Sequence, residues 1–66
     1  MYKLIVVCYR KDGSKITYTN QYYYVEACFT HIYAISKEFS SVHYEIYKRN
    51  RYKYELQEKG QFNERS

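Results

Sequence analysis

The sequence predicts a small α+β domain in which two β-hairpins flank one amphipathic helix, in the order β-β-α-β-β. Three observations predict it: an apolar run over residues 4–9, a helical repeat over 25–39, and alternation over 42–48 and 52–58. The chain has 66 residues, enough for one domain and too few for two. We expect a single compact domain over residues 1–59 and a loose tail over 60–66.

The first hairpin begins with a strand that is apolar on both faces. Residues 4–9 are rich in β-branched side chains, which is typical of a strand in the middle of a sheet. Asp12-Gly13 favours a tight type I′ turn, because both central residues of that turn need positive φ. A two-residue turn at this point pairs Tyr9 with Ile16.

A helix is predicted over residues 21–40, with Asn20 as its N-cap. At a rise of about 1.5 Å per residue, this helix crosses the whole sheet. The second and third strands then run parallel, joined by a right-handed crossover. The predicted strand order is 2-1-3-4, with 2-1-4-3 as the alternative. The stripe facing the sheet consists of Val25, Cys28, Phe29, Ile32, Ile35, Ser36 and Phe39.

The second hairpin is predicted from the alternation over residues 42–48 and 52–58. A three-residue loop over 49–51 pairs Ile46 with Tyr54 and Tyr44 with Leu56, which keeps both apolar sets on one side of the sheet. The alternative is a second helix over 51–59, where Lys, Glu, Leu and Gln favour helix. We favour the hairpin.

The hydrophobic content predicts a thin core and an uncovered surface. Hydrophobic residues make up 45% of the chain, but 11 of them are tyrosines, which we expect to supply much of the core. One helix is too narrow to cover both faces of a four-stranded sheet. Either Leu4, Val6 and Cys8, or the alternate residues 5, 7 and 9, therefore stay uncovered. Exposed apolar patches mark contact sites, so a partner protein or a second copy should bind there.

Several classes of protein are disfavoured by what the sequence lacks. No apolar run is long enough for a transmembrane helix, and the N-terminus lacks the features of a signal peptide. We therefore expect a cytoplasmic protein in which Cys8 and Cys28 are reduced thiols. His31 and His43 have no ligand spacing with the cysteines, so no metal or other cofactor is expected. The sequence shows no catalytic motif or phosphate-binding loop, so we expect no enzymatic activity.

The outer face of the predicted helix is the first candidate site. Its centre carries small or aromatic residues where a solvated helix is usually charged, and these favour close approach of another chain. The candidate partner-binding residues are Tyr23, Ala27, Thr30, Tyr33 and Ala34, together with Tyr47 on the third strand.

The basic hairpin loops are the second candidate site. The chain carries a net charge of +4, which permits an acidic partner. The alternative function is nucleic-acid binding, with bases stacking on tyrosine, through Lys48, Arg49, Arg51, Tyr52 and Lys53. The predicted topology places this loop and the loop near Arg10, Lys11 and Lys15 at opposite ends of the sheet. That separation splits the charge and favours solvated tips.

The whole chain resembles the small tyrosine-, lysine- and glutamate-rich proteins encoded by phages and mobile elements, anti-CRISPR inhibitors among them. The shared features are the short length, the absence of proline, the bare hairpin start MYKLIVV and the lack of a catalytic motif. The resemblance implies a non-enzymatic inhibitor that binds a host protein or nucleoprotein complex in the host cytosol. A homodimer, or a structural protein that assembles only with itself, is the remaining expectation.

Overall fold

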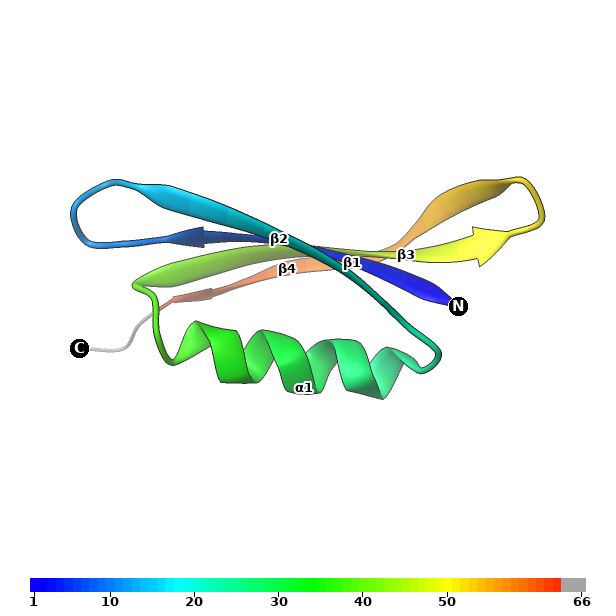
Figure 1. Ribbon diagram of the computed structural model, residues 1–66, viewed down its shortest axis with the longest axis horizontal. Coiled ribbons are helices and arrows are strands. Elements are labelled where there is room, and N and C mark those ends of the chain that lie inside the picture. The colour runs from blue at the N-terminus through cyan, green and yellow to red at the C-terminus, as the bar shows by residue number, and fades with distance from the viewer. Residues whose placement is uncertain (64–66) are drawn as a thin grey trace.

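The computed structural model describes residues 1–63 and shows the predicted β-β-α-β-β order. Its four strands form one antiparallel sheet in the order β2-β1-β3-β4, which confirms the predicted order 2-1-3-4 and places the first strand inside the sheet (Figure 1). The second hairpin, rather than a helix over 51–59, is also confirmed. The elements are β1 (Tyr2–Tyr9), β2 (Lys15–Tyr22), α1 (Val25–Ser36), β3 (Ser41–Asn50) and β4 (Lys53–Asn63).

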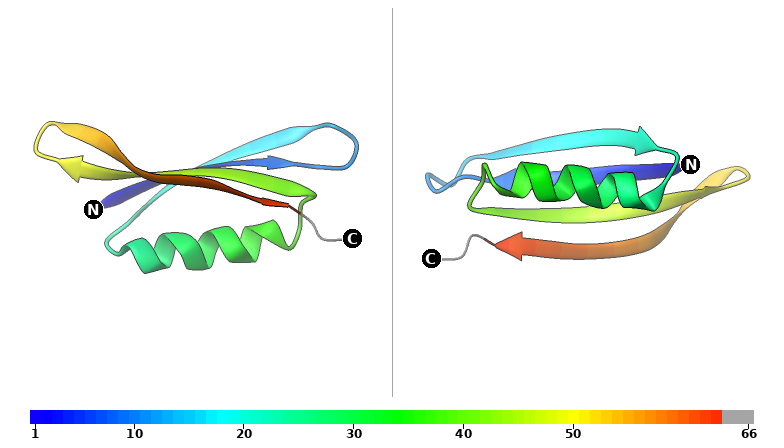
Figure 2. Two further views of the ribbon diagram at one scale, coloured as in Figure 1. Left: turned by 180° about the vertical axis from the view of Figure 1, so that it is seen from behind. Right: turned by 90° about the horizontal axis from the view of Figure 1, so that it is seen from below.

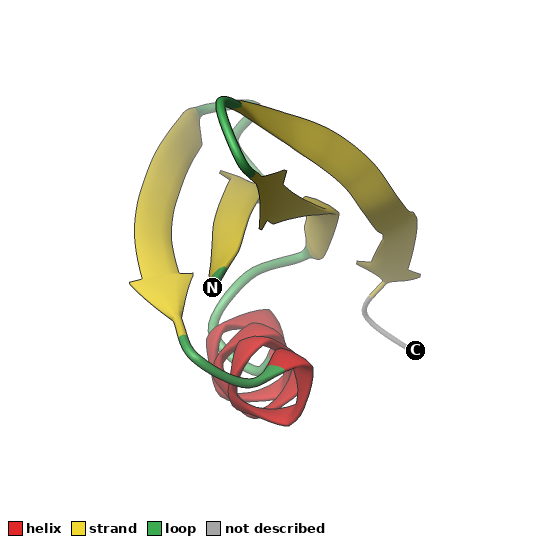
Figure 3. Cartoon of the chain, turned by 90° about the vertical axis from the view of Figure 1, so that its right-hand side faces the viewer, coloured by secondary structure: helices red, strands yellow, loops and turns green. Residues whose placement is uncertain are grey.

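The sheet and α1 form two layers. Seen from the helix side and from the end, α1 lies across one face of the sheet, and nothing among residues 1–63 covers the other face (Figures 2 and 3). Because β2 and β3 both pair antiparallel with β1, they run parallel to each other and α1 forms the crossover between them. The two hairpin loops lie at opposite ends of the long axis, and both bend away from α1 (Figure 1).

The helix is shorter than the sequence predicts, and its N-cap is Tyr24, not Asn20. The reason is that β2 continues to Tyr22, since Asn20 and Tyr22 pair with Leu4 and Tyr2 of β1. The last residues of β2 form backbone hydrogen bonds with the first residues of β1. A helix that began at residue 21 would remove these hydrogen bonds. The expected stripe is nevertheless correct where it packs on the sheet, since Cys28 and Ile32 are fully buried.

The first hairpin differs from the prediction by one residue in register. Cys8 pairs with Ile16 and Tyr9 with Lys15, so the loop is longer than two residues. The amide of Gly13 donates to the Arg10 carbonyl at 3.1 Å, and Gly13 has φ +92°. In this loop positive φ is required at one position, as in a type I turn followed by a left-handed residue, and not at two as in type I′.

The second hairpin has the reverse error, because its loop is shorter than predicted. Asn50 pairs with Lys53 around a turn at residues 51–52, and Arg51 takes a positive φ of 57°. The turn at 51–52 moves the partners of β3 by three residues from the prediction, with Tyr47 opposite Leu56. A β-bulge between Ile46 and Tyr47 adds one more residue, so that Tyr44 lies opposite Gly60 rather than Leu56. The bulge turns the last part of β4 so that residue 62, not residue 56, packs beside the core.

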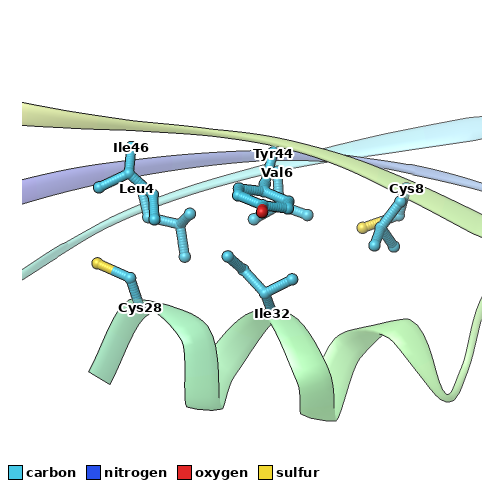
Figure 4. Packing of buried hydrophobic residues seen from close by; sticks show 8 residues of the cluster. Leu4, Val6, Cys8, Cys28, Ile32, Tyr44 and Ile46 are labelled. Atoms are coloured by element: carbon cyan, nitrogen blue, oxygen red, sulfur yellow. The ribbon is translucent and has the colours of Figure 1, made fainter. Parts of the chain in front are cut away.

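The core lies between α1 and the inner face of the sheet (Figure 4). The helix therefore covers the face of β1 that carries Leu4, Val6 and Cys8, which settles the choice that the sequence leaves open. The expectation that tyrosine supplies much of the core is wrong for the described residues, because Tyr44 is the one buried tyrosine and the others lie at its margin or outside. The buried residues are Leu4, Val6, Cys8, Cys28, Ile32, Val42, Tyr44 and Ile46.

The sheet extends beyond the boundary expected at residue 59. Residues 60–63 belong to β4, with Phe62 opposite Val42. The remainder of the expected tail, residues 64–66, lies outside the described residues.

Candidate binding surfaces

The outer face of the sheet, which we call the open sheet face, is built by strand alternation. On β1 the side chains that point away from α1 are those at positions 3, 5, 7 and 9, and the pairing places their neighbours from β2, β3 and β4 on the same face. Its apolar centre is Ile5 and Val7, which are half-buried. The polar and aromatic residues around this centre include Lys3, Tyr9, Lys15, Thr17, Thr19, His43, Glu45, Tyr47, Arg49, Lys59 and Gln61.

A concavity of about 620 Å³ occupies the middle of the open sheet face. Its floor is formed by Ile5, Val7 and Tyr9 of β1, and its sides include His43 of β3 and Lys59 of β4. The Tyr9 and His43 rings meet edge to face, with centroids 5.3 Å apart. The concavity therefore combines an apolar floor with two aromatic rings, one cation and the carboxylate of Glu45.

The Tyr54 side chain lies across the other end of the open sheet face. It starts from the edge strand β4 and reaches the opposite edge strand, where Gln21 Nε2 donates to its hydroxyl at 3.3 Å. On the way its ring passes Lys3, whose Nζ lies 5.3 Å from the ring centroid. No pattern in the sequence predicts this contact, because it depends on the bulge and on the bend of the second hairpin.

Basic residues outnumber acidic ones on the open sheet face. Lys3, Lys15, Arg49 and Lys59 lie on it by strand pairing, against the one carboxylate of Glu45. The hydroxyl of Tyr47 donates to Glu45 Oε1 at 2.9 Å. This bond to the carboxylate raises the pKa of Tyr47 above its ordinary value, because it favours the protonated phenol.

The second surface, which we call the outer helix surface, consists of Tyr23, Ala27, Thr30, Tyr33 and Ala34. Tyr23 and Tyr33 are 76% and 60% exposed. Tyr23 lies in the bend before α1 rather than on the helix. Tyr24 beside it is also exposed, although the prediction did not include it. Lys37 Nζ lies 4.6 Å from the Tyr33 ring centroid, so one of the two tyrosine rings carries a cation on its face.

The structure does not bring all the predicted site residues together. Tyr47 lies on the open sheet face, separated from the outer helix surface by the full thickness of the domain. Lys48 and Arg49 point to opposite faces of β3, since Lys48 pairs with Tyr2 and Arg49 with Tyr54. The three remaining members of the predicted nucleic-acid cluster, Arg51, Tyr52 and Lys53, are exposed at the tip of the second hairpin.

The two thiols are buried, and each of the two histidines packs edge to face against a tyrosine. Cys8 and Cys28 are free and buried, and burial raises the pKa of both thiols. His31 Nδ1 is hydrogen-bonded to the Tyr22 hydroxyl and their rings pack edge to face, so this pair connects α1 to β2. Among residues 1–63 no three His, Cys, Asp or Glu side chains are grouped as a metal site requires.

Two further observations bear on the class of protein. No helix within the described part of the chain has the length and apolar character needed to cross a membrane. Comparison of the chain with protein-family models, curated proteins and solved structures gives no match.

Proposed function

We propose that the chain is a non-enzymatic binding protein of the phage-inhibitor, anti-CRISPR type, which blocks a host macromolecule by protein–protein contact. The observation that carries the proposal is the exposure of Tyr23 and Tyr33 beside the small residues Ala27, Thr30 and Ala34. An exposed tyrosine presents a large rigid ring with a polar end, and small neighbours let a partner backbone approach closely.

The absence of catalysis is part of the same proposal. A thiol is nucleophilic as the thiolate, and burial of Cys8 and Cys28 opposes that form. A cytoplasmic location also fits the proposal, since both cysteines are free and a reducing compartment keeps thiols in that state.

Affinity capture tests this function. The tagged protein is used to capture its partner from a bacterial host lysate, and the wild type is compared with the double variant Tyr23→Ala and Tyr33→Ala. Interface anchors cost about 2 kcal/mol or more when truncated, so the double variant should lose at least about 30-fold in affinity for the captured protein. Both side chains are exposed, and we expect its thermal unfolding midpoint to match that of the wild type.

Tyr52→Ala is the matched control, because Tyr52 is 97% exposed but lies at the tip of the second hairpin. It should capture the partner as the wild type does. Equal capture by all three proteins would contradict the choice of the outer helix surface, and capture of no protein by the wild type would contradict the function itself.

A further inference from the structure

The bend of the two hairpins gives the open sheet face a shape that the sequence does not predict. The basic loops lie at opposite ends of the sheet as predicted, but both turn toward the side away from α1 (Figure 1). The longest dimension of the molecule is 41 Å. The two basic tips therefore flank one continuous concave surface, and their charge acts on the same side of the molecule.

The charge of the molecule is distributed unevenly between its two sides. The open sheet face has Lys3, Lys15, Arg49 and Lys59 against Glu45. The helix side of the molecule has Lys37, Lys48 and Lys53 against Glu26, Glu38, Glu55 and Glu58. The excess positive charge therefore lies on the side that no element covers. A surface of this kind attracts polyanions and releases their counterions on binding.

The floor of the open sheet face indicates which polyanion fits. Ile5 and Val7 provide an apolar centre, and Tyr9, His43 and Tyr54 provide rings on the same face. Unpaired bases stack on such rings and on apolar surface, whereas a duplex presents mainly phosphates. A basic surface without this floor would bind either form through its phosphates.

We infer that the open sheet face binds single-stranded nucleic acid, with the phosphates near its basic side chains and the bases over its central rings. This surface lies on the opposite side of the molecule from the outer helix surface. The two can therefore act together on a nucleoprotein complex, and each can be removed without the other.

Fluorescence anisotropy with labelled dT12 and rU12 tests the inference. Even at the duplex spacing of about 3.4 Å per phosphate a dodecamer spans about 40 Å, and an unpaired strand extends further, so the probe is long enough to follow the 41 Å long axis. With four phosphates neutralised, the slope of log affinity against log salt should be about −2.8, so that affinity falls about 50-fold between about 50 and 200 mM salt. No binding at the lower salt concentration overturns the inference.

Charge-matched variants locate the site. The double variant Lys15→Gln and Lys59→Gln removes two cations of the open sheet face, and its salt slope should fall to about −1.4. The control, Lys37→Gln with Lys48→Gln, removes the same charge from the helix side and should leave the slope unchanged. Equal losses in the two double variants would show a non-specific effect of net charge and overturn the assignment.

His43→Ala tests the stacking of bases, because His43 is exposed and its removal leaves the core intact. Loss of one stacked base should weaken binding by at least about fivefold at every salt concentration, without changing the slope.

Tighter binding to a duplex of the same length contradicts a single-strand site. Loss of protein capture in Lys15→Gln/Lys59→Gln, with no oligonucleotide bound by the wild type, assigns the face to a protein instead. The Tyr23/Tyr33 variant should bind both oligonucleotides normally, which separates this test from that of the proposed function.

Discussion

At the scale of single residues, the contact between Gly60 and Tyr44 shows how β4 completes the core. The Tyr44 ring lies over the backbone of Gly60 on the neighbouring strand and is 8% exposed. Its ring also contacts Phe29 edge to face and Phe62 in a stacked arrangement, each with centroids 5.8 Å apart. The only buried tyrosine in the described residues therefore depends on a residue without a side chain. This cross-strand pairing of an aromatic ring with a glycine stabilises a position that is otherwise weak in a strand.

Gly60→Ala should destabilise the domain by about 2 kcal/mol, measured by urea denaturation. A Cβ at this position would lie 2.6 Å from Tyr44 Cζ and 2.8 Å from Tyr44 Cε2, so the ring must leave its place between Phe29 and Phe62. The sign is informative, because glycine to alanine inside a strand ordinarily gains about 0.5–1 kcal/mol.

The control for this prediction is the same substitution in a Tyr44→Leu background. Leucine has no atoms in the position of the outer ring, so Gly60→Ala should then cost much less. The difference between the two backgrounds is the coupling energy of the pair. Equal costs in both backgrounds would show that the loss has another cause.

At the scale of elements, the sequence predicts each element and the strand order but neither hairpin register. Element type follows from local periodicity, and the apolar residues of β1 and α1 give a clear pattern. Register depends on where the turn falls: the first hairpin differs from the predicted register by one residue, and the second differs by three residues near its turn. The Asp12-Gly13 pair is compatible with two turn types. The bulge between Ile46 and Tyr47 places Tyr44 opposite Gly60, a contact between distant residues that local periodicity does not predict.

For the candidate binding surfaces, too, the sequence predicts features that depend on one element and does not predict those that depend on how distant elements are arranged. Exposure of Thr30, Tyr33 and Ala34 could be predicted from the helical repeat, because these residues lie on one element, whereas Tyr23 lies in the bend before it. The shape of the open sheet face could not, because it results from the bend of two hairpins relative to α1. Tyr54 is the clearest case, since its contact with Gln21 joins the two edge strands across the whole sheet.

The N-terminus of α1 is an element that can be strengthened. Tyr24 has the extended backbone of an N-cap, φ −126° and ψ 141°, but its side chain makes no capping hydrogen bond. Tyr24→Asp supplies a side-chain acceptor for a backbone amide of the first turn and a negative charge near the positive end of the helix, so it should stabilise the domain by about 1 kcal/mol. Urea denaturation measures the gain. Tyr24→Ala, which has no acceptor, should show none, and an equal gain in both variants would exclude capping as its source.

At the scale of the whole molecule, stability should decline in alkaline solution, because the core contains groups that ionise there. Burial raises the pKa of the Cys8 and Cys28 thiols above their ordinary value of 9.0. It also raises the pKa of Tyr22 and Tyr44 above 10.0, with the Glu58 carboxylate adding to the effect at Tyr44. The folded chain thus holds these protons more tightly than the unfolded chain. Their contribution is complete below the unfolded pKa values and is lost as the pH rises through the folded ones.

We therefore expect the free energy of unfolding to fall above about pH 9, first through the thiols and then through the phenols. Each pKa unit by which burial raises a group corresponds to about 1.4 kcal/mol of lost stability once that group ionises in the folded chain. Urea denaturation at intervals from about pH 7 to about pH 11 measures the profile. Cys28→Ala should remove part of the early decline, whereas Tyr52→Phe should leave the profile unchanged because Tyr52 is 97% exposed. A free energy that stays constant through about pH 10.5 would mean that the buried thiols and phenols do not contribute to alkaline unfolding.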